Sequence, residues 1–474
     1  MPSSLQQEIE QQQRWHLRPK YRSLQQQFEL LVQNEFVAPE QQLAAQVVRL
    51  QQLLMHSAAA VPYYRSLFSR TGFDPAAVTH LEQLAELPLL QRQTVQEQGE
   101  ELLAEVLPEG FSPGGSARTS GTSGQPVEIM RTRESLMAAP LMKQREYRWF
   151  RFDPRGKFAS IRNAPDLPRN KGALLEPGQT IRGSAWAAVG GMFHTGPWLG
   201  LSDATPADDQ VEWLEQHQPD YLLGQSALME QLAFAYHGKD SLQNLAAIET
   251  VSQQLTAEMR FKLESAFKVP VHQNYGLNEV GVVAIRCPEG GRYHVHSELC
   301  MVEIVDEAGQ PCRPGEQGRL LVTAFNNPAM PLIRYDTDDL AEPVEGPCPC
   351  GRTLPSFRNV HGRYRRTIQC PPETWRYWAA VMRSLDYASR ELASGLRQYQ
   401  LHQYLDKRYE LRLVTAAKPP QAFEEHVRAA WQKVAEGEPP ELIIRYVEHI
   451  ERPRGGKFQN FTSDFAAATG MDEQ

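Results

Sequence analysis

Apolar, β-prone runs alternate with helical stretches from about residue 111 to 340, and this alternation constrains the fold more than any other feature of the chain. In chain order the runs include KFASIR, YLLGQSALMEQLAFAYHG, LAAIETVS, TAEMRFKLESAF and VPVHQNYG. Strands separated by helices predict an α/β body with parallel sheets. The stretch 299–342 differs, because Gly and Pro turns between its β-prone segments predict hairpins.

Three domains are expected from length and pattern. A chain of 474 residues is too long for one ordinary core. Residues 1–56 are Gln-rich with leucines at helical spacing, which predicts a helical cap packed on the body; a partner-binding helix is the alternative. Residues 57–361 form the large domain. The strand and helix pattern restarts after 361 and predicts a small α+β domain over 362–474.

Composition excludes several function classes. A chain with a net charge of −8 lacks the excess of basic residues that is typical of nucleic-acid-binding proteins. No apolar run approaches the roughly 20 residues needed to cross a bilayer. The opening MPSSLQQEIEQQQ lacks the basic-then-apolar pattern of a secretory signal, so we expect a cytoplasmic protein. Six cysteines are too few for a disulfide scaffold in a chain of this size and are expected as free thiols or metal ligands.

A hydroxyl-rich turn, ARTSGTSGQP at 117–126, precedes the apolar VEIM. Backbone N–H groups and hydroxyls in such a turn can cradle phosphate oxygens without a cationic side chain. The segment is not a Walker loop, because Gln125 stands where a lysine would be expected. A flexible polar turn is the alternative interpretation.

Four further motifs follow in order: QNYGLNEVG at 273–281, PLIRYDTDDL at 331–340, HGRYRR at 361–366 and RPRGGKF at 452–458. Together with the turn near 120, they resemble the adenylate-forming superfamily of acyl-CoA synthetases and adenylation domains. Within it the chain is most similar to the phenylacetate–CoA ligase branch, including its coenzyme F390 synthetase-like members, from about residue 45 onward. The resemblance implies a large adenylate-forming body and a small C-terminal domain that rotates about a hinge.

The resemblance assigns a nucleotide site. The residues that it places around ATP are Thr119, Ser120, Gly121, Thr122, Ser123 and Gly124 at the phosphates, Tyr275 on adenine with Gly276 and Asn278, and Asp339 at the ribose hydroxyls. Glu279 would hold Mg²⁺. A carboxylate suits a vicinal diol as a bidentate acceptor, and Asp336 and Asp338 are adjacent alternatives to Asp339.

Two basic residues complete the implied catalytic set. Arg363 matches an arginine at the junction of the two domains that contacts ribose or phosphate, although Arg365 and Arg366 follow where the family usually has an acidic pair. Lys457, in a Gly-rich loop before Phe458, matches the family's catalytic lysine. Its ammonium would neutralise charge as a carboxylate attacks the α-phosphate.

A structural zinc site is also expected. Cys287 and His294 lie close in sequence, and Cys348 and Cys350 form a C-x-C pair beyond a probable hairpin region. Three thiolates and one imidazole suit a closed tetrahedral site, and relatives in the resembled branch carry zinc at equivalent positions. His296 could replace His294 as the ligand. Cys300, Cys312 and Cys370 are expected to be packing residues.

The function implied is ATP-dependent activation of a small-molecule carboxylic acid, followed by acyl transfer to coenzyme A. The stretch TIQCPPETW at 367–375 lacks glycines that usually help to line the CoA tunnel, so a carrier-protein thiol or an amine is an alternative acceptor. A non-catalytic nucleotide-binding descendant is a further alternative. Small and aromatic residues from about 185 indicate an apolar or aromatic acid, although plain packing also explains them. A homodimer is possible.

Overall fold

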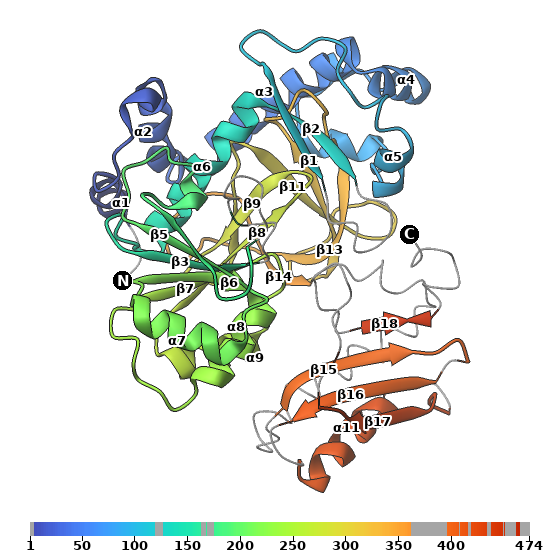
Figure 1. Cartoon of the computed structure of the whole chain (residues 1–474). Coiled ribbons are helices and arrows are strands. Elements are labelled where there is room, and N and C mark those ends of the chain that lie inside the picture. Colours follow the sequence, from blue (N-terminus) through green and yellow to red (C-terminus); the bar gives the residue numbers. More distant parts are fainter. Residues whose placement is uncertain are drawn as a thin grey trace. The chain divides into compact units, whose positions relative to one another are not determined.

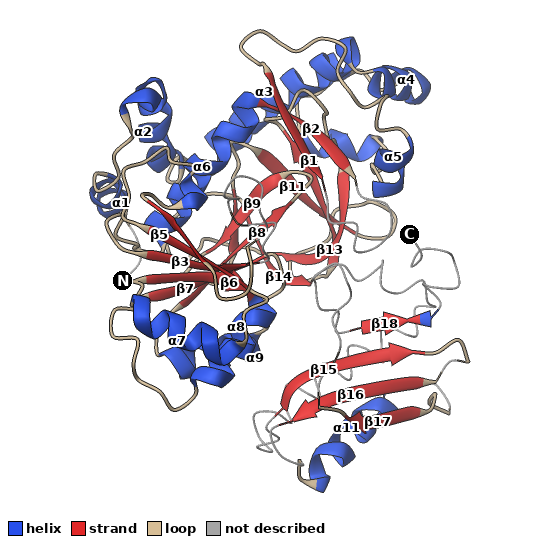
Figure 2. Cartoon of the chain, in the orientation of Figure 1, coloured by secondary structure: helices blue, strands red, loops and turns tan. Residues whose placement is uncertain are grey.

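The computed structural model describes residues 4–118, 127–162, 167, 175–361, 396–406, 408–415, 419–433, 438–448, 450 and 461–464. These residues fall into two compact units, one up to residue 361 and one from residue 396 onward. Helices and strands are mixed in both (Figure 2). The boundaries 1–56, 57–361 and 362–474 drawn from the sequence remain predictions.

Helices cover the large unit in separate groups along the chain (Figure 1). The α-helices are α1 (Leu5–Gln12), α2 (Gln25–Asn34), α3 (Pro39–Ala60), α4 (Pro62–Thr71), α5 (Arg92–Glu97), α6 (Arg133–Trp149), α7 (Ala207–His217), α8 (Ser226–Tyr236) and α9 (Ala257–Phe267). Short 3-10 turns are η1 (Pro19–Leu24), η2 (Pro75–Ala77), η3 (Leu81–Glu86) and η5 (Ala187–Val189). The helix α3 begins with a proline in its first turn, where the missing N–H costs nothing.

The strands of the large unit build a small ribbon and one large sheet. The ribbon pairs β1 (Pro113–Arg118) with β2 (Glu128–Thr132). The large sheet contains β3 (Phe158–Arg162), β4 (Thr180–Gly183), β5 (Trp198–Ser202), β6 (Tyr221–Gln225), β7 (Ala247–Val251), β8 (Val271–Leu277), β9 (Gly281–Arg286), β10 (Tyr293–Val295), β11 (Cys300–Val305), β12 (Gly318–Ala324), β13 (Tyr335–Pro343) and β14 (Ser356–His361).

The 12-stranded sheet runs in the order β11-β12-β13-β14-β10-β9-β8-β7-β6-β3-β5-β4. Strands β5, β3, β6, β7 and β8 are parallel, which confirms the βαβ pattern read from the sequence. Antiparallel pairing begins at β8–β9, and β11 pairs with β12 as the predicted hairpin. The strand β8 therefore joins the parallel half to the antiparallel half.

Separate hydrophobic clusters hold these layers together. On one face of the parallel strands, α7, α8 and α9 bury Leu214, Met229, Leu232 and Leu263. Elsewhere an aromatic cluster joins Trp15, which follows α1, to α2, α6 and the sheet through Tyr147 and Trp186 among others. In α3, Leu50, Leu53 and Leu54 recur at helical spacing and pack with the antiparallel strands.

The second unit is a small α+β structure. Its four-stranded sheet has the order β17-β16-β15-β18, from β15 (Leu396–Gln403), β16 (Tyr409–Thr415), β17 (Leu442–Tyr446) and β18 (Phe461–Ser463). The helix α11 (Gln421–Lys433) packs on it through Phe423, Val427 and Trp431. In the described part of the chain, no helix combines the length and the apolar character that a membrane span requires.

Candidate functional site

A buried hydrogen bond joins two of the sequence motifs. Tyr275 lies in β8, and its hydroxyl donates to Oδ2 of Asp339 in β13 at 2.6 Å. Only 9% of Tyr275 and 5% of Asp339 are exposed. The structure thus brings together the residue expected beneath adenine and the residue expected at the ribose.

The three neighbouring aspartates of β13 have different surroundings. The carboxylate of Asp336 pairs with Arg319 and is buried. The residue Asp338 has a left-handed backbone (φ 61°), and its N–H donates to Oδ1 of Asp336 at 3.1 Å. The geometry therefore favours Asp339 over the adjacent aspartates, because Asp336 is already neutralised by a guanidinium and Asp339 shares its site with Tyr275.

The carboxylate of Glu279 lies in the turn between β8 and β9 and is 1% exposed. It forms an ion pair with Arg92 of α5 and accepts a 3.2 Å hydrogen bond from the Tyr335 hydroxyl. Burial, and then the charge of Glu279, raise the pKa of Tyr335, so its hydroxyl stays protonated as a donor. In this structure the counter-ion of the expected magnesium ligand is a guanidinium.

The β8–β9 turn itself is fixed by Arg131 of β2. Its two terminal nitrogens donate to the carbonyl oxygens of Val280 and Asn278, each at 2.9 Å. Burial lowers the pKa of Arg131 to about 10, and the nearby Glu279 charge opposes that shift. A Cβ on Gly276 would lie 2.8 Å from the carbonyl oxygen of Gly281, so only glycine fits there without a shift.

Sequence reasoning missed Arg92, Arg131 and Tyr335. Arg131 directly follows the apolar run VEIM, and Tyr335 lies within the motif PLIRYDTDDL, but neither position reveals its contacts. The contacts of Arg131 lie 147 and 149 residues away, so the motif around Glu279 does not reveal them.

A second cluster joins Cys287, His294, Cys348 and Cys350, whose ligand atoms all lie within 4.8 Å of one another. All four residues are buried. The Sγ atoms of Cys287 and Cys348 are 3.9 Å apart, and His294 Nε2 lies 3.5 Å from Cys350 Sγ. Sulfur atoms bound to one tetrahedral zinc at about 2.3 Å stand at comparable separations. The donor set fits a closed zinc site.

Groups around the four side chains support the same geometry. The other ring nitrogen of His294 lies 3.1 Å from the carbonyl oxygen of Leu354, which orients Nε2 toward the thiols. Backbone N–H groups of Gly290 and Arg352 donate to Cys287 Sγ and Cys350 Sγ at 3.3 and 3.4 Å. A Cβ on Gly290 would lie 2.2 Å from Cys348 Sγ. In contrast, His296 lies beside Arg145, with 3.3 Å between Nδ1 and Nη1.

Arg352 links this cluster to the N-terminal helices. Its side chain donates to Glu8 Oε1 of α1 at 2.7 Å and to Glu35 Oε2, just after α2, at 3.3 Å. The guanidinium also lies 3.9 Å from the ring of Trp149. Glu8, Glu35 and Arg352 are all buried, so these charges depend on one another for compensation.

The chain is similar in sequence to a known enzyme family and to two named relatives. The AMP-binding enzyme family matches residues 118–327. The phenylacetate–coenzyme A ligase of Thermus thermophilus is 25% identical over 337 residues, which are 69% of this chain and 72% of that protein. The phenylacetate–coenzyme A ligase of Escherichia coli is 25% identical over 333 residues, 68% of this chain and 70% of that protein.

The chain is thus similar to AMP-binding enzymes over residues 118–327 and to phenylacetate–coenzyme A ligases over about two thirds of its length. A crystal structure of a 2-hydroxyisobutyryl-CoA ligase in its postadenylation state matches it with a TM-score of 0.69 at 16% identity, covering 92% of this chain and 93% of that one. This likeness confirms the predicted fold class, an α/β body with a C-terminal domain.

Several residues expected in the nucleotide site lie outside the described ranges. They are Thr119, Ser120, Gly121, Thr122, Ser123, Gly124, Arg363 and Lys457. The basic pair Arg365 and Arg366 and the packing residue Cys370 lie outside them as well. The structure therefore describes the adenine, ribose and magnesium side of the predicted site, and the roles of the others remain proposals.

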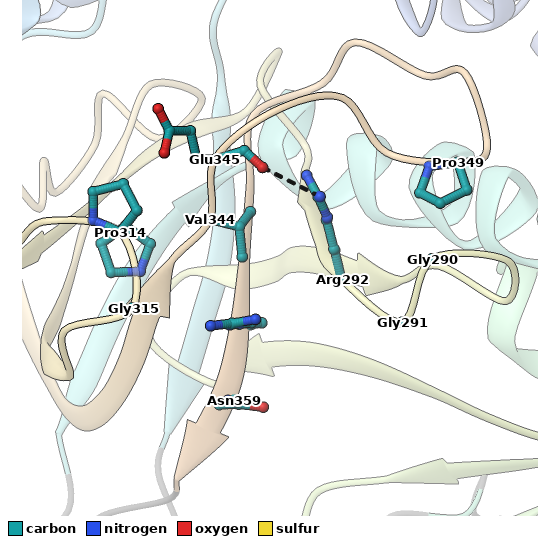
Figure 3. Close-up of a pocket in the computed structure, with 11 residues that line it drawn as sticks. Gly290, Gly291, Arg292, Pro314, Gly315, Val344, Glu345, Pro349 and Asn359 are labelled. Atoms are coloured by element: carbon teal, nitrogen blue, oxygen red, sulfur yellow. Dashed lines mark hydrogen bonds between the residues drawn. The ribbon is translucent and has the colours of Figure 1, made fainter.

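The large unit also has an open pocket of about 490 Å³ (Figure 3). Its lining consists of Gly290, Gly291, Arg292, Pro314, Gly315, Pro343, Val344, Glu345, Pro349, Arg358 and Asn359. Arg292 donates to the carbonyl oxygens of Gly346 and Glu345 at 2.6 and 3.3 Å. No residue predicted from the sequence to bind nucleotide lines this pocket.

The aromatic stretch from 185 to 200 is packed into the core of the large unit. Trp186, Phe193 and Trp198 are at most 4% exposed and belong to the same aromatic cluster as residues of α2 and α6. Trp15 meets the rings of Trp186 and Phe193 edge-on, each at a centroid distance of 5.7 Å. The plain-packing alternative therefore holds for these side chains, and they give no information about the acid.

Proposed function

We propose that this protein activates a small aromatic or apolar carboxylic acid as its acyl-adenylate and transfers the acyl group to coenzyme A. The observation that carries the proposal is the 2.6 Å hydrogen bond between Tyr275 and Asp339, which joins two nucleotide-binding motifs 64 residues apart in one buried site. The relatives named phenylacetate–coenzyme A ligase support the choice of acid and acceptor.

In the first step a carboxylate oxygen of the acid forms a bond to the α-phosphorus of ATP. The bond from that phosphorus to the bridging oxygen breaks, and pyrophosphate leaves. Asp339 accepts the ribose hydroxyls, and Tyr275 supports the adenine. Residues 119–124 surround the leaving phosphates, and Arg363 and Lys457 stabilise the negative charge that develops.

In the second step the thiolate of the acceptor attacks the acyl carbon, and the bond to the AMP oxygen breaks. Coenzyme A is the proposed acceptor. A carrier-protein thiol or an amine is the second candidate, because 367–375 lacks the glycines usual at this place in the family.

Glu279 is the proposed ligand of Mg²⁺, which supplies neutralisation of the phosphate charges when bound. Because Arg92 pairs with Glu279 in this structure, metal binding has to compete with a buried guanidinium. The Tyr335 hydroxyl donates to the same carboxylate and helps to hold its orientation.

The proposed zinc serves stability. Cys287, His294, Cys348 and Cys350 fill all four positions of a tetrahedral ion and leave none for a substrate or water. A reducing compartment such as the cytoplasm is proposed, because Cys287, Cys300, Cys312, Cys348 and Cys350 are free thiols in the described structure.

Acid-dependent exchange of labelled pyrophosphate into ATP tests the first step, and mass spectrometry of the products with CoA, carrier protein or amine tests the second. Exchange followed by an acyl-CoA product supports the proposal. Exchange without an acyl-CoA product moves the acceptor to the second candidate. Nucleotide binding without exchange for any acid in a broad panel identifies a non-catalytic descendant.

A further inference from the structure

A charged cluster is buried where α6 packs on β7 and β8. Lys143 Nζ donates to Glu146 Oε2 at 2.6 Å and also donates to Glu249 Oε1. Asn274 Nδ2 donates to the same two oxygens, at 2.8 Å and 3.3 Å. The side chains of Glu146 and Glu249 are 0% exposed, whereas Lys143 is 12% exposed. Both donors therefore serve one oxygen of each carboxylate.

The other oxygen of each carboxylate lacks a well-formed hydrogen bond. Glu146 Oε1 and Glu249 Oε2 are buried without one to any described residue, and the Tyr147 hydroxyl, which also lacks one, lies close enough to Glu249 to interact with it. A buried polar atom left unpaired costs about 1–3 kcal/mol, and more when it is charged. A purely structural ion cluster would be expected to satisfy these oxygens. The two oxygens therefore retain the capacity to accept a further hydrogen bond.

The titration of Glu146 is consistent with this deficit. Burial raises the pKa of Glu146 to about 7, with Lys143 opposing the shift and Glu249 adding to it. Arg162, at the end of β3, adds a positive charge that acts on Tyr147. Near neutral pH the cluster therefore holds a carboxyl that gains from any added donor or positive charge.

The position of the cluster connects it to the proposed reaction. Glu249 belongs to β7 and Asn274 to β8, which are parallel neighbours in the sheet. Asn274 directly precedes Tyr275, the residue bonded to Asp339. An acid whose carboxylate meets the α-phosphate near Tyr275 can extend its acyl part toward Asn274.

We propose that Glu146 and Glu249 determine specificity by accepting hydrogen bonds from an amino or hydroxyl substituent on the acyl part of the substrate. Lys143 and Asn274 are positioning residues that hold the two carboxylates. The inference rests on the proposed function and narrows its substrate to aromatic acids with such a donor.

Matched substrates test the inference in the intact wild-type enzyme. Acid-dependent pyrophosphate exchange is measured for benzoate and phenylacetate bearing an amino, a hydroxyl or a methyl group at each ring position. The amino or hydroxyl acid at one position is expected to exceed its methyl counterpart in kcat/KM by at least about tenfold, because a hydrogen bond to a charged group is lost with the methyl acid. The ring amino and hydroxyl groups are both neutral donors near pH 7, and the methyl group is the matched substituent that cannot donate.

Two variants locate the effect. Glu249→Gln and Glu146→Gln are each expected to reduce the donor-to-methyl ratio of kcat/KM by at least about tenfold, whereas Glu212→Gln on the exposed face of α7 leaves it unchanged. If Glu146 and Glu249 had only a structural role, each variant would lower kcat/KM by the same factor for all acids, and the donor-to-methyl ratio would not change.

The outcomes separate the two proposals. Exchange with methyl acids at least as fast as with donor acids overturns the specificity inference and leaves the proposed function standing, and this wild-type result decides even when a variant does not fold. A ratio that both variants leave unchanged also overturns it. Absence of exchange for every acid overturns the proposed function itself.

Discussion

The hydroxyl of Tyr275 donates to the carboxylate of Asp339 at 2.6 Å across 64 residues of sequence. Because both residues are expected at the nucleoside of ATP, Asp339→Ala should raise the KM for ATP by at least tenfold, and the loss of a buried hydrogen bond should also cost about 1–3 kcal/mol of the free energy of unfolding. Tyr275→Phe keeps the ring and removes one hydrogen bond, so we expect a loss of about two- to tenfold. Steady-state exchange kinetics at varied ATP measure both.

The neighbouring aspartate provides the control for that comparison. Asp338→Asn retains a residue type that tolerates the left-handed backbone at this position and should leave the KM for ATP within about twofold. A large effect of Asp338→Asn on the KM for ATP, with no effect of Asp339→Ala, would show that Asp338 binds the ribose and would contradict the role given to Asp339.

Arg92 and Glu279 should be coupled in stability. Removing one partner leaves a buried charge uncompensated, so Arg92→Met is expected to cost about 3–5 kcal/mol of the free energy of unfolding. The double variant Arg92→Met/Glu279→Gln should recover part of this loss. Denaturant unfolding of the four proteins gives the coupling energy, and simple additivity of the two single changes would argue against a buried pair.

Metal removal should loosen the N-terminal helices. Arg352 donates to Cys350 Sγ through its backbone and to Glu8 and Glu35 through its side chain, so the cysteine cluster proposed to hold zinc shares one buried network with α1 and α2. We expect one zinc per chain, and faster proteolysis within residues 1–38 after chelation or in Cys348→Ser. Cys312→Ser, a half-buried cysteine outside the cluster, is the control. Full stability and unchanged cleavage of the metal-free protein would contradict a structural zinc.

His272 should make the protein sensitive to acid. Burial, with the charges of Arg260 and Arg286, lowers its pKa from 6.5 to about 3, and its ring stacks on Phe150 at 4.1 Å. The unfolded chain therefore binds one more proton between these values, so stability present above pH 6.5 is lost as the pH falls toward 3. The slope reaches about 1.4 kcal/mol per pH unit. Unfolding of His272→Phe measured from pH 7 to 4 should show a shallower loss; an identical slope would exclude this histidine.

Local patterns predicted much of the fold. The runs that form β3, β6, β7 and β8 and the helices α8 and α9 were visible as apolar segments of strand or helix length. The joining of parallel and antiparallel halves at β8 was not, because strand order depends on pairings between distant segments that leave no local signal. The residue types around Trp186 could not distinguish an acid-binding pocket from plain packing, because the same aromatic and small residues fill cores and apolar pockets.

The residues of the candidate site also fall into two groups, those that a local sequence motif predicts and those that only the folded structure brings together. The residues Tyr275, Glu279 and Asp339 were found because each belongs to a short motif, and the cysteine cluster because thiol and imidazole spacing is characteristic. Arg92 pairs with a residue 187 positions away, and Arg352 with one 344 away. Neither partner choice follows from periodicity, because each depends on how separate layers of the fold meet.

Acid-dependent exchange of pyrophosphate into ATP, with Lys457→Ala beside wild type, tests the central claim most directly. Lys433→Ala, an exposed lysine at the end of α11, is the matched control. We predict exchange that requires a carboxylic acid, persists in Lys433→Ala and falls by at least about a hundredfold in Lys457→Ala, because a cation that stabilises developing charge is removed. Exchange that is absent from the folded wild-type protein with every acid, or equal in the two lysine variants, would contradict the account.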